Sequence, residues 1–155
     1  MSDKDFCLTL RFNAPAAKLY QQFATEQGVR NWWTEFCTME ERVGGQAAFR
    51  FPSAGFHAVV RIAELKPHQL VEWECLESEH PDNSGFVDLH DWVGTRMRFE
   101  IEPKGAGQSQ LAFTHVGLIP LECKEACSSL WSFYLGQSLR GYLETGSGKP
   151  HTKDA

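Results

Sequence analysis

The chain contains 155 residues, of which 42% are hydrophobic and 23% are charged. This length is typical of one ordinary domain, and it supplies enough apolar surface for a core that needs no disulfide or metal as a staple. Fifteen Lys and Arg against 20 Asp and Glu give a net charge of -5. That balance argues against nucleic acid or an anionic membrane as the main partner.

The N-terminus and the cysteines indicate the compartment. The first residues are polar and charged, and no apolar run of about 18 residues occurs, so neither a signal peptide nor a membrane helix is predicted. An odd number of cysteines without a secretion signal favours reduced, mostly buried thiols. We therefore expect a cytoplasmic protein with no membrane partner. The cysteines are Cys7, Cys37, Cys75, Cys123 and Cys127.

The N-terminal part of the chain predicts a strand followed by two helices. Apolar and polar residues alternate through 6–12, which is typical of a strand. Asn13 is expected to cap the helix that follows. Thr25 is expected to cap a second short helix that ends near Trp32-Trp33.

Six further segments alternate with a period of two and are predicted to be strands. Between the fourth and fifth of them, the polar stretch 77–91 is expected to form a long surface loop. Glycine, proline and short polar runs between the other segments predict hairpin turns, so the strands should pair antiparallel. The six segments are 36–39, 46–51, 56–62, 70–75, 93–101 and 111–115.

The last periodic segment, 121–143, predicts a long amphipathic helix. Its apolar residues, Leu130 among them, fall on one broad face and its polar residues on the other. At 1.5 Å per residue it would span roughly 35 Å, so only a curved sheet offers a partner of the right size. The chain 1–155 is therefore predicted to be a single α+β domain with a flexible tail from about Gly146.

Several short motifs, in order along the chain, resemble one known family. The chain looks like the homologues of the heat-shock protein 90 ATPase activator, within the START-like or SRPBCC superfamily. The resemblance runs from about residue 6 to residue 150 and implies a helix-grip fold: a curved antiparallel sheet of six to seven strands around a long C-terminal helix, with a cavity between them. The motifs are Asn13-Ala14-Pro15, Trp32-Trp33, Gly44-Gly45, Leu70-Val71-Glu72-Trp73, Gly94-Thr95, Thr114-His115 and Tyr142-Leu143-Glu144-Thr145-Gly146.

The resemblance implies a function less directly than it implies a fold. Relatives of this single-domain size look like binders of small hydrophobic molecules, which makes such a ligand the expected partner. The eukaryotic activators carry a separate N-terminal domain that makes much of the chaperone contact, and 155 residues leave room for one domain. A chaperone cofactor role, a homodimer, and a cyclase- or hydrolase-type enzyme in the same cavity remain the alternatives.

Inward-facing positions on the strands and the long helix form the candidate ligand site. An apolar hollow with a few polar tips is typical of small-molecule sites. The competing interpretation for each aromatic residue taken singly is a close-packed core, whereas the set as a whole favours a cavity. The candidates are Trp32, Trp33, Phe49, Phe51, Trp73, Met97, Phe99, Phe113, His115, Trp131, Tyr134 and Tyr142.

His115 is the candidate with titratable chemistry, because counting by two from Phe113 places it on the inner face. There it would either donate to a ligand or act as a general base, the role that the enzyme alternative assigns to it or to a tyrosine. A structural histidine with hydrogen-bond partners is the favoured interpretation. No catalytic residue and no cofactor are assigned.

Two further clusters contain residue types that can bind a metal. Asp88 and His90 lie in the predicted loop with His80, Asp82 and Asp91, but their spacing fits no metal signature, and a solvated loop is favoured. The second cluster, the Cys123 and Cys127 pair, falls on one helix face, where burial in the core is favoured over a half-site or redox pair. No metal site is predicted.

Overall fold

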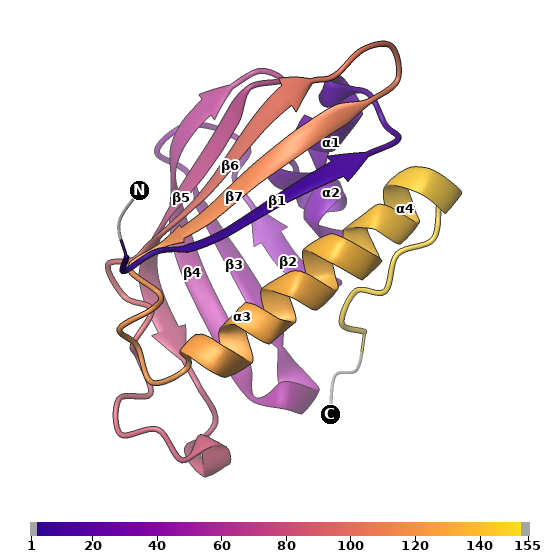
Figure 1. Ribbon diagram of the computed structural model, residues 1–155. Coiled ribbons are helices and arrows are strands. Elements are labelled where there is room, and N and C mark those ends of the chain that lie inside the picture. Colours follow the sequence, from indigo (N-terminus) through magenta and orange to yellow (C-terminus); the bar gives the residue numbers. More distant parts are fainter. Residues whose placement is uncertain (1–2, 153–155) are drawn as a thin grey trace.

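The computed structural model describes residues 3–152, which form one seven-stranded antiparallel sheet and a long C-terminal helix (Figure 1). The strands are ordered β1-β7-β6-β5-β4-β3-β2 across the sheet. Both the strand count and the antiparallel pairing agree with the α+β prediction. The strands are β1 Phe6–Phe12, β2 Phe36–Met39, β3 Gln46–Phe51, β4 Phe56–Lys66, β5 Leu70–Glu79, β6 Arg96–Pro103 and β7 Ser109–Val116.

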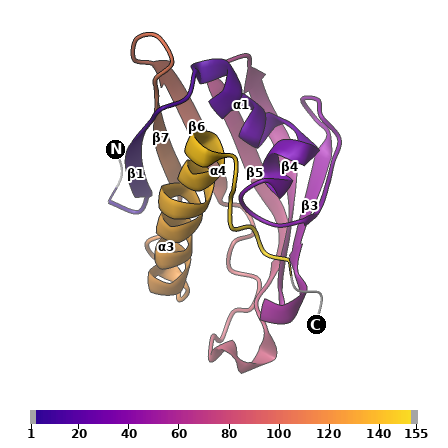
Figure 2. The same ribbon diagram turned by 90° about the vertical axis from the view of Figure 1, so that its right-hand side faces the viewer.

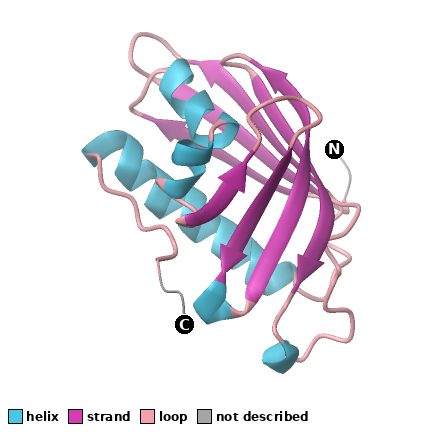
Figure 3. Cartoon of the chain, turned by 180° about the vertical axis from the view of Figure 1, so that it is seen from behind, coloured by secondary structure: helices cyan, strands magenta, loops and turns pink. Residues whose placement is uncertain are grey.

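The helices lie against one face of this curved sheet (Figures 1 and 3). The long helix comprises α3, a π-helical segment and α4 in continuous succession, and two short helices follow β1 as predicted. Single 3₁₀ turns interrupt two of the loops. The helical elements are α1 Ala16–Ala24, α2 Glu26–Arg30, 3₁₀ turns at Pro52–Ala54 and Asp82–Ser84, α3 Lys124–Phe133, the π-helical segment Tyr134–Leu139 and α4 Arg140–Thr145.

The curvature of the sheet has a local cause in β4. The register between β4 and β5 shifts between Val59 and Val60 and again between Ile62 and Glu64. Such bulges bend the bulged strand and increase its twist. The sheet can therefore wrap around the long helix instead of lying flat beside it.

The short helices begin as their local chemistry dictates, with one difference from expectation. Thr25 caps α2 as predicted, since its hydroxyl accepts a hydrogen bond from the Gly28 amide at 2.9 Å. At α1 the N-cap is Pro15 and not Asn13. Pro15 provides its carbonyl to the amides of Lys18 and Leu19, and this carbonyl starts the helix without a side-chain cap.

The π-helical segment within the long helix changes which residues face the sheet. A π turn holds more residues than an α turn, so positions counted at a constant angle drift out of phase across it. Leu135, Ser138 and Leu139 are buried there. Leu130, which the projection placed on the apolar face, is 53% exposed, and that assignment was wrong.

The loop between β5 and β6 differs from the solvated loop predicted for residues 77–91. His80, Asp91 and Trp92 are all buried, and β5 itself continues to Glu79. The predicted start of the next strand at Val93 was also wrong. Gly94 has a φ of +87°, the Thr95 amide bonds the Trp92 carbonyl, and the resulting turn leaves Val93 51% exposed.

The segment after α4 packs back onto the domain, in contrast to the flexible tail predicted from composition (Figure 2). The His151 amide donates to the Trp33 carbonyl at 2.9 Å, and the Glu35 amide donates to the His151 carbonyl at 2.9 Å. Gly148 permits the approach, since a Cβ there would lie 2.1 Å from the Asn31 carbonyl oxygen. Residues 153–155 lie outside the described part of the chain.

The core occupies the space between the sheet and the helices and is dominated by aromatic rings. Trp33 stacks on Trp73 with centroids 5.9 Å apart and on Trp131 at 5.1 Å, while Phe23 stacks on Phe99 at 4.2 Å. Rings this close contribute more than the area they bury. Among the described residues, no helix is long and apolar enough to cross a membrane.

Candidate functional site

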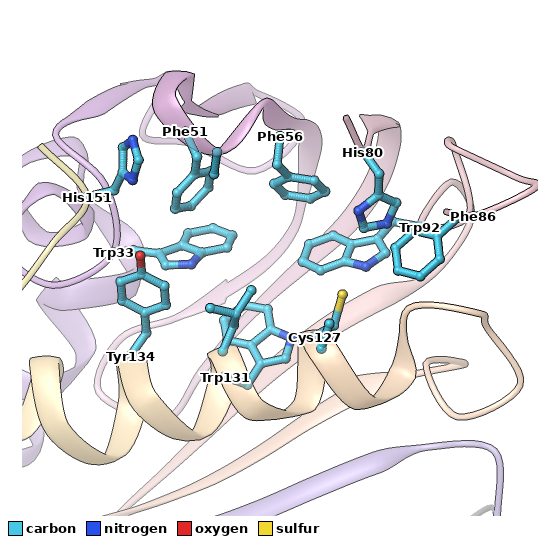
Figure 4. A pocket seen from close by; sticks show the side chains of 13 residues that line it. Trp33, Phe51, Phe56, His80, Phe86, Trp92, Cys127, Trp131, Tyr134 and His151 are labelled. Carbon is cyan, nitrogen blue, oxygen red and sulfur yellow. The ribbon is translucent and has the colours of Figure 1, made fainter. Parts of the chain in front are cut away.

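A small apolar cavity lies between the first turns of α3 and the ends of β3, β4 and β5 (Figure 4). Its volume is about 140 Å³. Aromatic rings form most of its wall, so a ligand inside would meet mainly apolar surface. The lining residues are Trp33, Phe51, Ala54, Phe56, His80, Phe86, Trp92, Ala126, Cys127, Leu130, Trp131, Tyr134 and His151.

The cavity opens to solvent beside α3. Ala54, Ala126 and Leu130 all line it and are exposed at the surface, whereas Trp92 and Trp131 deeper in are buried. The small side chains of Ala54 and Ala126 at the mouth leave a passage for a ligand of modest width. Substitutions at Ala126 would therefore alter access without disturbing the core.

The two ends of the cavity carry different polar groups (Figure 4). The Tyr134 ring and the His151 imidazole lie at one end, and His80 and Cys127 lie at the other. Burial raises the pKa of the Tyr134 phenol, so this hydroxyl stays protonated at neutral pH. Each end thus offers a hydrogen-bonding or ligating group next to apolar walls.

Four of the twelve candidate ligand residues line this cavity: Trp33, Phe51, Trp131 and Tyr134. Tyr142 is half-buried elsewhere, with the Lys18 ammonium 5.6 Å from its ring centroid. The others are buried in the core beyond the cavity wall, and contact of any candidate with a ligand stays a prediction. These core residues are Trp32, Phe49, Trp73, Met97, Phe99, Phe113 and His115.

His115 is buried, and both of its ring nitrogens have hydrogen-bond partners within the protein. The Trp131 indole donates to His115 Nδ1 at 3.0 Å, and His115 Nε2 lies 2.9 Å from Thr95 Oγ1. The Thr95 hydroxyl in turn donates to the Trp92 carbonyl at 2.6 Å. These partners assign the proton to Nε2 and leave no nitrogen for a ligand.

The electrostatics of His115 agree with this assignment. Burial lowers its pKa to about 3, so the ring is neutral at physiological pH. A general base needs a free nitrogen within reach of the substrate, and His115 is not among the residues that line the cavity. The geometry therefore favours the structural interpretation of His115 over an acid–base role for its ring, and an acid–base role for a tyrosine stays a prediction.

His80 has partners of a different kind. Its Nε2 lies 2.8 Å from Asp91 Oδ1, and both side chains are buried. Burial alone would lower the pKa of His80, but hydrogen bonds with Cys123 and Asp91 and the negative charge of Asp91 raise it above the ordinary value. His80 also lies close to both Cys123 and Cys127, since the three possible ligand atoms are within 4.8 Å of one another.

Five aromatic or imidazole residues of the wall were not among the candidates from the sequence. Phe56 begins a segment that alternates with a period of two, and this alternation could have placed its side chain on the inner face. The other four lie in loops or in the C-terminal segment, where no periodicity indicates which side chains point inward. The five are Phe56, His80, Phe86, Trp92 and His151.

Asp88 and His90, the first pair of possible ligands in the loop, each contact backbone groups in the structure. His90 Nδ1 lies 2.6 Å from the Ser78 carbonyl oxygen, and the Asp88 carboxylate accepts the His90 backbone amide at 2.9 Å. These contacts hold the loop in place. The Asp88 carboxylate thus contacts backbone within the loop, and the His90 ring contacts backbone of β5.

A curved antiparallel sheet that grips a long C-terminal helix, with a small apolar cavity between them, defines a START-like helix-grip protein. Residues 13–144 match the family described as "Activator of Hsp90 ATPase homolog 1-like protein". The match covers most of the chain. This protein therefore belongs to that family, as the sequence motifs indicated.

Solved structures share the fold. The Aha1 dimer from Colwellia psychrerythraea superposes with a TM-score of 0.73 at 25% identity, covering 93% of this chain and 98% of that one. DynU16, a protein in the dynemicin biosynthetic locus, superposes with a TM-score of 0.70 at 17% identity, covering 99% of this chain and 51% of that one. CV1439 from Chromobacterium violaceum superposes with a TM-score of 0.64 at 19% identity, covering 92% of this chain and 99% of that one. No curated protein matches the chain.

Proposed function

We propose that the protein binds a small, largely hydrophobic molecule in the cavity between α3 and the sheet. The observation that carries the proposal is the apolar cavity itself, walled by aromatic rings and open beside Ala126. Concave apolar pockets with a few polar groups are the usual form of small-molecule sites. Binding in the compartment predicted from the sequence, the cytoplasm, is part of the same proposal.

The size of the cavity limits the ligand. Its volume of about 140 Å³ is below the roughly 300–1,000 Å³ of pockets for drug-sized molecules. It is close to the roughly 150 Å³ of an engineered apolar cavity that binds benzene. The ligand we propose is accordingly one aromatic or aliphatic ring with short substituents, and a hydroxyl on it would meet Tyr134.

Titration with benzene and with phenol tests this proposal. We expect both to shift the indole N–H resonances of Trp92 and Trp131, with a dissociation constant of about 0.1–1 mM for a ligand of so few atoms. Phenol should bind more tightly than benzene, and Tyr134→Phe should reduce that difference. An absence of shifts at these indoles would contradict the proposal.

Variants at the mouth provide the matched control. Ala126→Phe places a ring in the opening and is expected to weaken benzene binding at least tenfold. Ser132→Phe adds the same ring at an exposed position of α3 that does not line the cavity, and affinity should be unchanged. Equal effects from both variants would show that the ligand enters or binds elsewhere.

A chaperone partner is the second candidate, favoured by the family match and by the Aha1 dimer among the similar structures. As a test, the purified chain is added to a heat-shock protein 90 and the ATPase rate is measured. A concentration-dependent rise would support a cofactor role. An unchanged rate at tens of micromolar would reject it, and native mass spectrometry of the chain alone would report whether it forms a homodimer.

A further inference from the structure

Three side chains with soft ligand atoms converge at one end of the cavity. Cys123 and Cys127 are one helical turn apart at the start of α3, where the Cys127 amide donates to the Cys123 carbonyl at 2.8 Å. Residues four apart share a helix face. His80, just after β5, completes the group, with all three possible ligand atoms within 4.8 Å of one another.

These distances are near those of a zinc site. With Zn–S of about 2.3 Å and Zn–N of about 2.0–2.1 Å, the ligand atoms of a tetrahedral zinc lie roughly 3.5–3.8 Å apart. The ligand atoms therefore need to approach one another by at most about 1.3 Å, which rotation of the side chains can supply. Imidazole and thiolate are the ligands that zinc prefers, and two thiolates balance its charge in an apolar surrounding.

Asp91 supplies the supporting contact that bound histidines usually have. Its Oδ1 lies 2.8 Å from His80 Nε2, which leaves Nδ1 as the nitrogen available to a metal. A carboxylate on the far nitrogen of a metal-bound histidine sets the tautomer and the orientation of the ring. Asp91 Oδ2 is buried without a hydrogen-bond partner in the described structure, so a nearby cation would offset a charge that is otherwise poorly compensated.

We propose that His80, Cys123 and Cys127 bind one zinc ion, with Asp91 as the positioning residue for His80. Both His80 and Cys127 line the cavity, whereas Cys123 is fully buried. The fourth coordination position is therefore directed into the cavity. Three protein ligands with one open position is the arrangement of zinc sites that take a water or substrate.

Cobalt substitution tests the site directly. The full chain, reduced and freed of metal by a chelator that is then removed, is titrated with Co²⁺ alone. We expect one Co²⁺ per chain, a thiolate-to-cobalt charge-transfer band and the visible bands of a tetrahedral ion. Zn²⁺ should displace the Co²⁺ and raise the melting temperature. An absence of the thiolate band in the wild-type chain would overturn the proposal, as would displacement by Cu⁺ but not by Zn²⁺.

Variants assign the ligands. Cys123→Ser, Cys127→Ser and His80→Gln should each lower zinc affinity about 100-fold or more. Asp91→Asn should lower it about 10–100-fold while leaving the thiolate band in place, as expected of a positioning residue. Cys37→Ser, a buried cysteine outside the group, is the matched control. Unchanged affinity in Cys123→Ser, or an equal loss in Cys37→Ser, would overturn the assignment.

This experiment is independent of the proposed ligand. Benzene binding by the metal-free chain tests the cavity, and cobalt binding without benzene tests the metal site. Failure of one leaves the other standing.

Discussion

His115 and His80 are both buried, yet the two regions around them differ in how completely their polar groups are satisfied. His115 lies on β7 and faces α3, and both of its nitrogens have neutral partners, Trp131 and Thr95. His80 lies just after β5, next to a carboxylate and two thiols.

The difference shows where in this fold chemistry can reside. In the core around His115, regular elements bring each donor to an acceptor and leave nothing for a ligand. At the cavity wall around His80, Asp91 Oδ2 has no hydrogen-bond partner in the described structure, and the thiols of Cys123 and Cys127 are not joined in a disulfide. Groups of this second kind are the ones expected at functional sites. The predictions below test this contrast, from the largest effect to the smallest.

The largest loss of stability is expected when a large side chain in the core is truncated. Phe99 is fully buried and stacks on Phe23, so Phe99→Ala should lower the free energy of unfolding by about 3–5 kcal/mol. Urea denaturation followed by tryptophan fluorescence measures this. A loss of less than about 1 kcal/mol would mean that the core around Phe99 is not close-packed.

Removing the His115 ring should cost less and should change the response to pH. His115→Leu leaves the Trp131 indole N–H without its acceptor, which should cost about 1–3 kcal/mol at pH 7. The folded pKa of about 3 lies below the unfolded value of about 6.5. Between these two values the unfolded chain binds a proton that the folded chain does not, so wild-type stability falls as pH falls.

The leucine variant lacks this contribution, so its stability should approach that of the wild type by up to about 1.4 kcal/mol per pH unit below pH 6. Urea midpoints at pH 7, 5 and 4 provide the comparison. Parallel curves for the two proteins would contradict a neutral, structural His115. Above pH 7 the difference between them should be constant.

Two glycines test whether the C-terminal segment belongs to the cavity region. Gly148→Ala would place a Cβ 2.1 Å from the Asn31 carbonyl oxygen. It should therefore release the segment that carries His151, at a cost of about 1–2 kcal/mol for the hydrogen bonds lost. Faster hydrogen exchange of the Glu35 amide, which bonds the His151 carbonyl, is the readout.

Gly136→Ala is the control for the Gly148→Ala variant. Apart from its chain neighbours and the backbone of its own helix, no atom of the described residues lies within 4 Å of a Cβ built there. Alanine is also favoured over glycine in helices by up to about 1 kcal/mol. Exchange at Glu35 should be unchanged and stability equal or higher. Faster exchange in this variant would show that the π-helical segment, and not Gly148, holds the C-terminal segment in place.

The smallest effect is expected at the cavity mouth. Leu130 is 53% exposed, so Leu130→Ala should change the free energy of unfolding by no more than about 0.5 kcal/mol. The rate of benzene exchange, measured by NMR line shape, should rise because the opening widens. A large loss of stability would place Leu130 in the core, as the helical projection had indicated.

The sequence by itself determined the regular part of this protein. Period-two alternation identified the strands and placed Phe99, Phe113 and His115 on the inner face, and the amphipathic segment identified the long helix. These assignments succeed because the backbone repeats, so the direction of a side chain follows from its position in the repeat.

Trp33, Phe51, Trp131 and Tyr134 of the cavity wall were among the candidates from the sequence, but tertiary structure alone decided the rest of the wall and the volume left inside. His80 meets Cys123 across 43 positions of sequence, and the loop residue Trp92 and His151 from the C-terminal segment turn inward without any repeat to signal it. The free volume depends on how closely rings such as Trp33 and Trp131 stack, and close packing is a property of the whole set of side chains together. Local patterns carry no record of such long-range contacts.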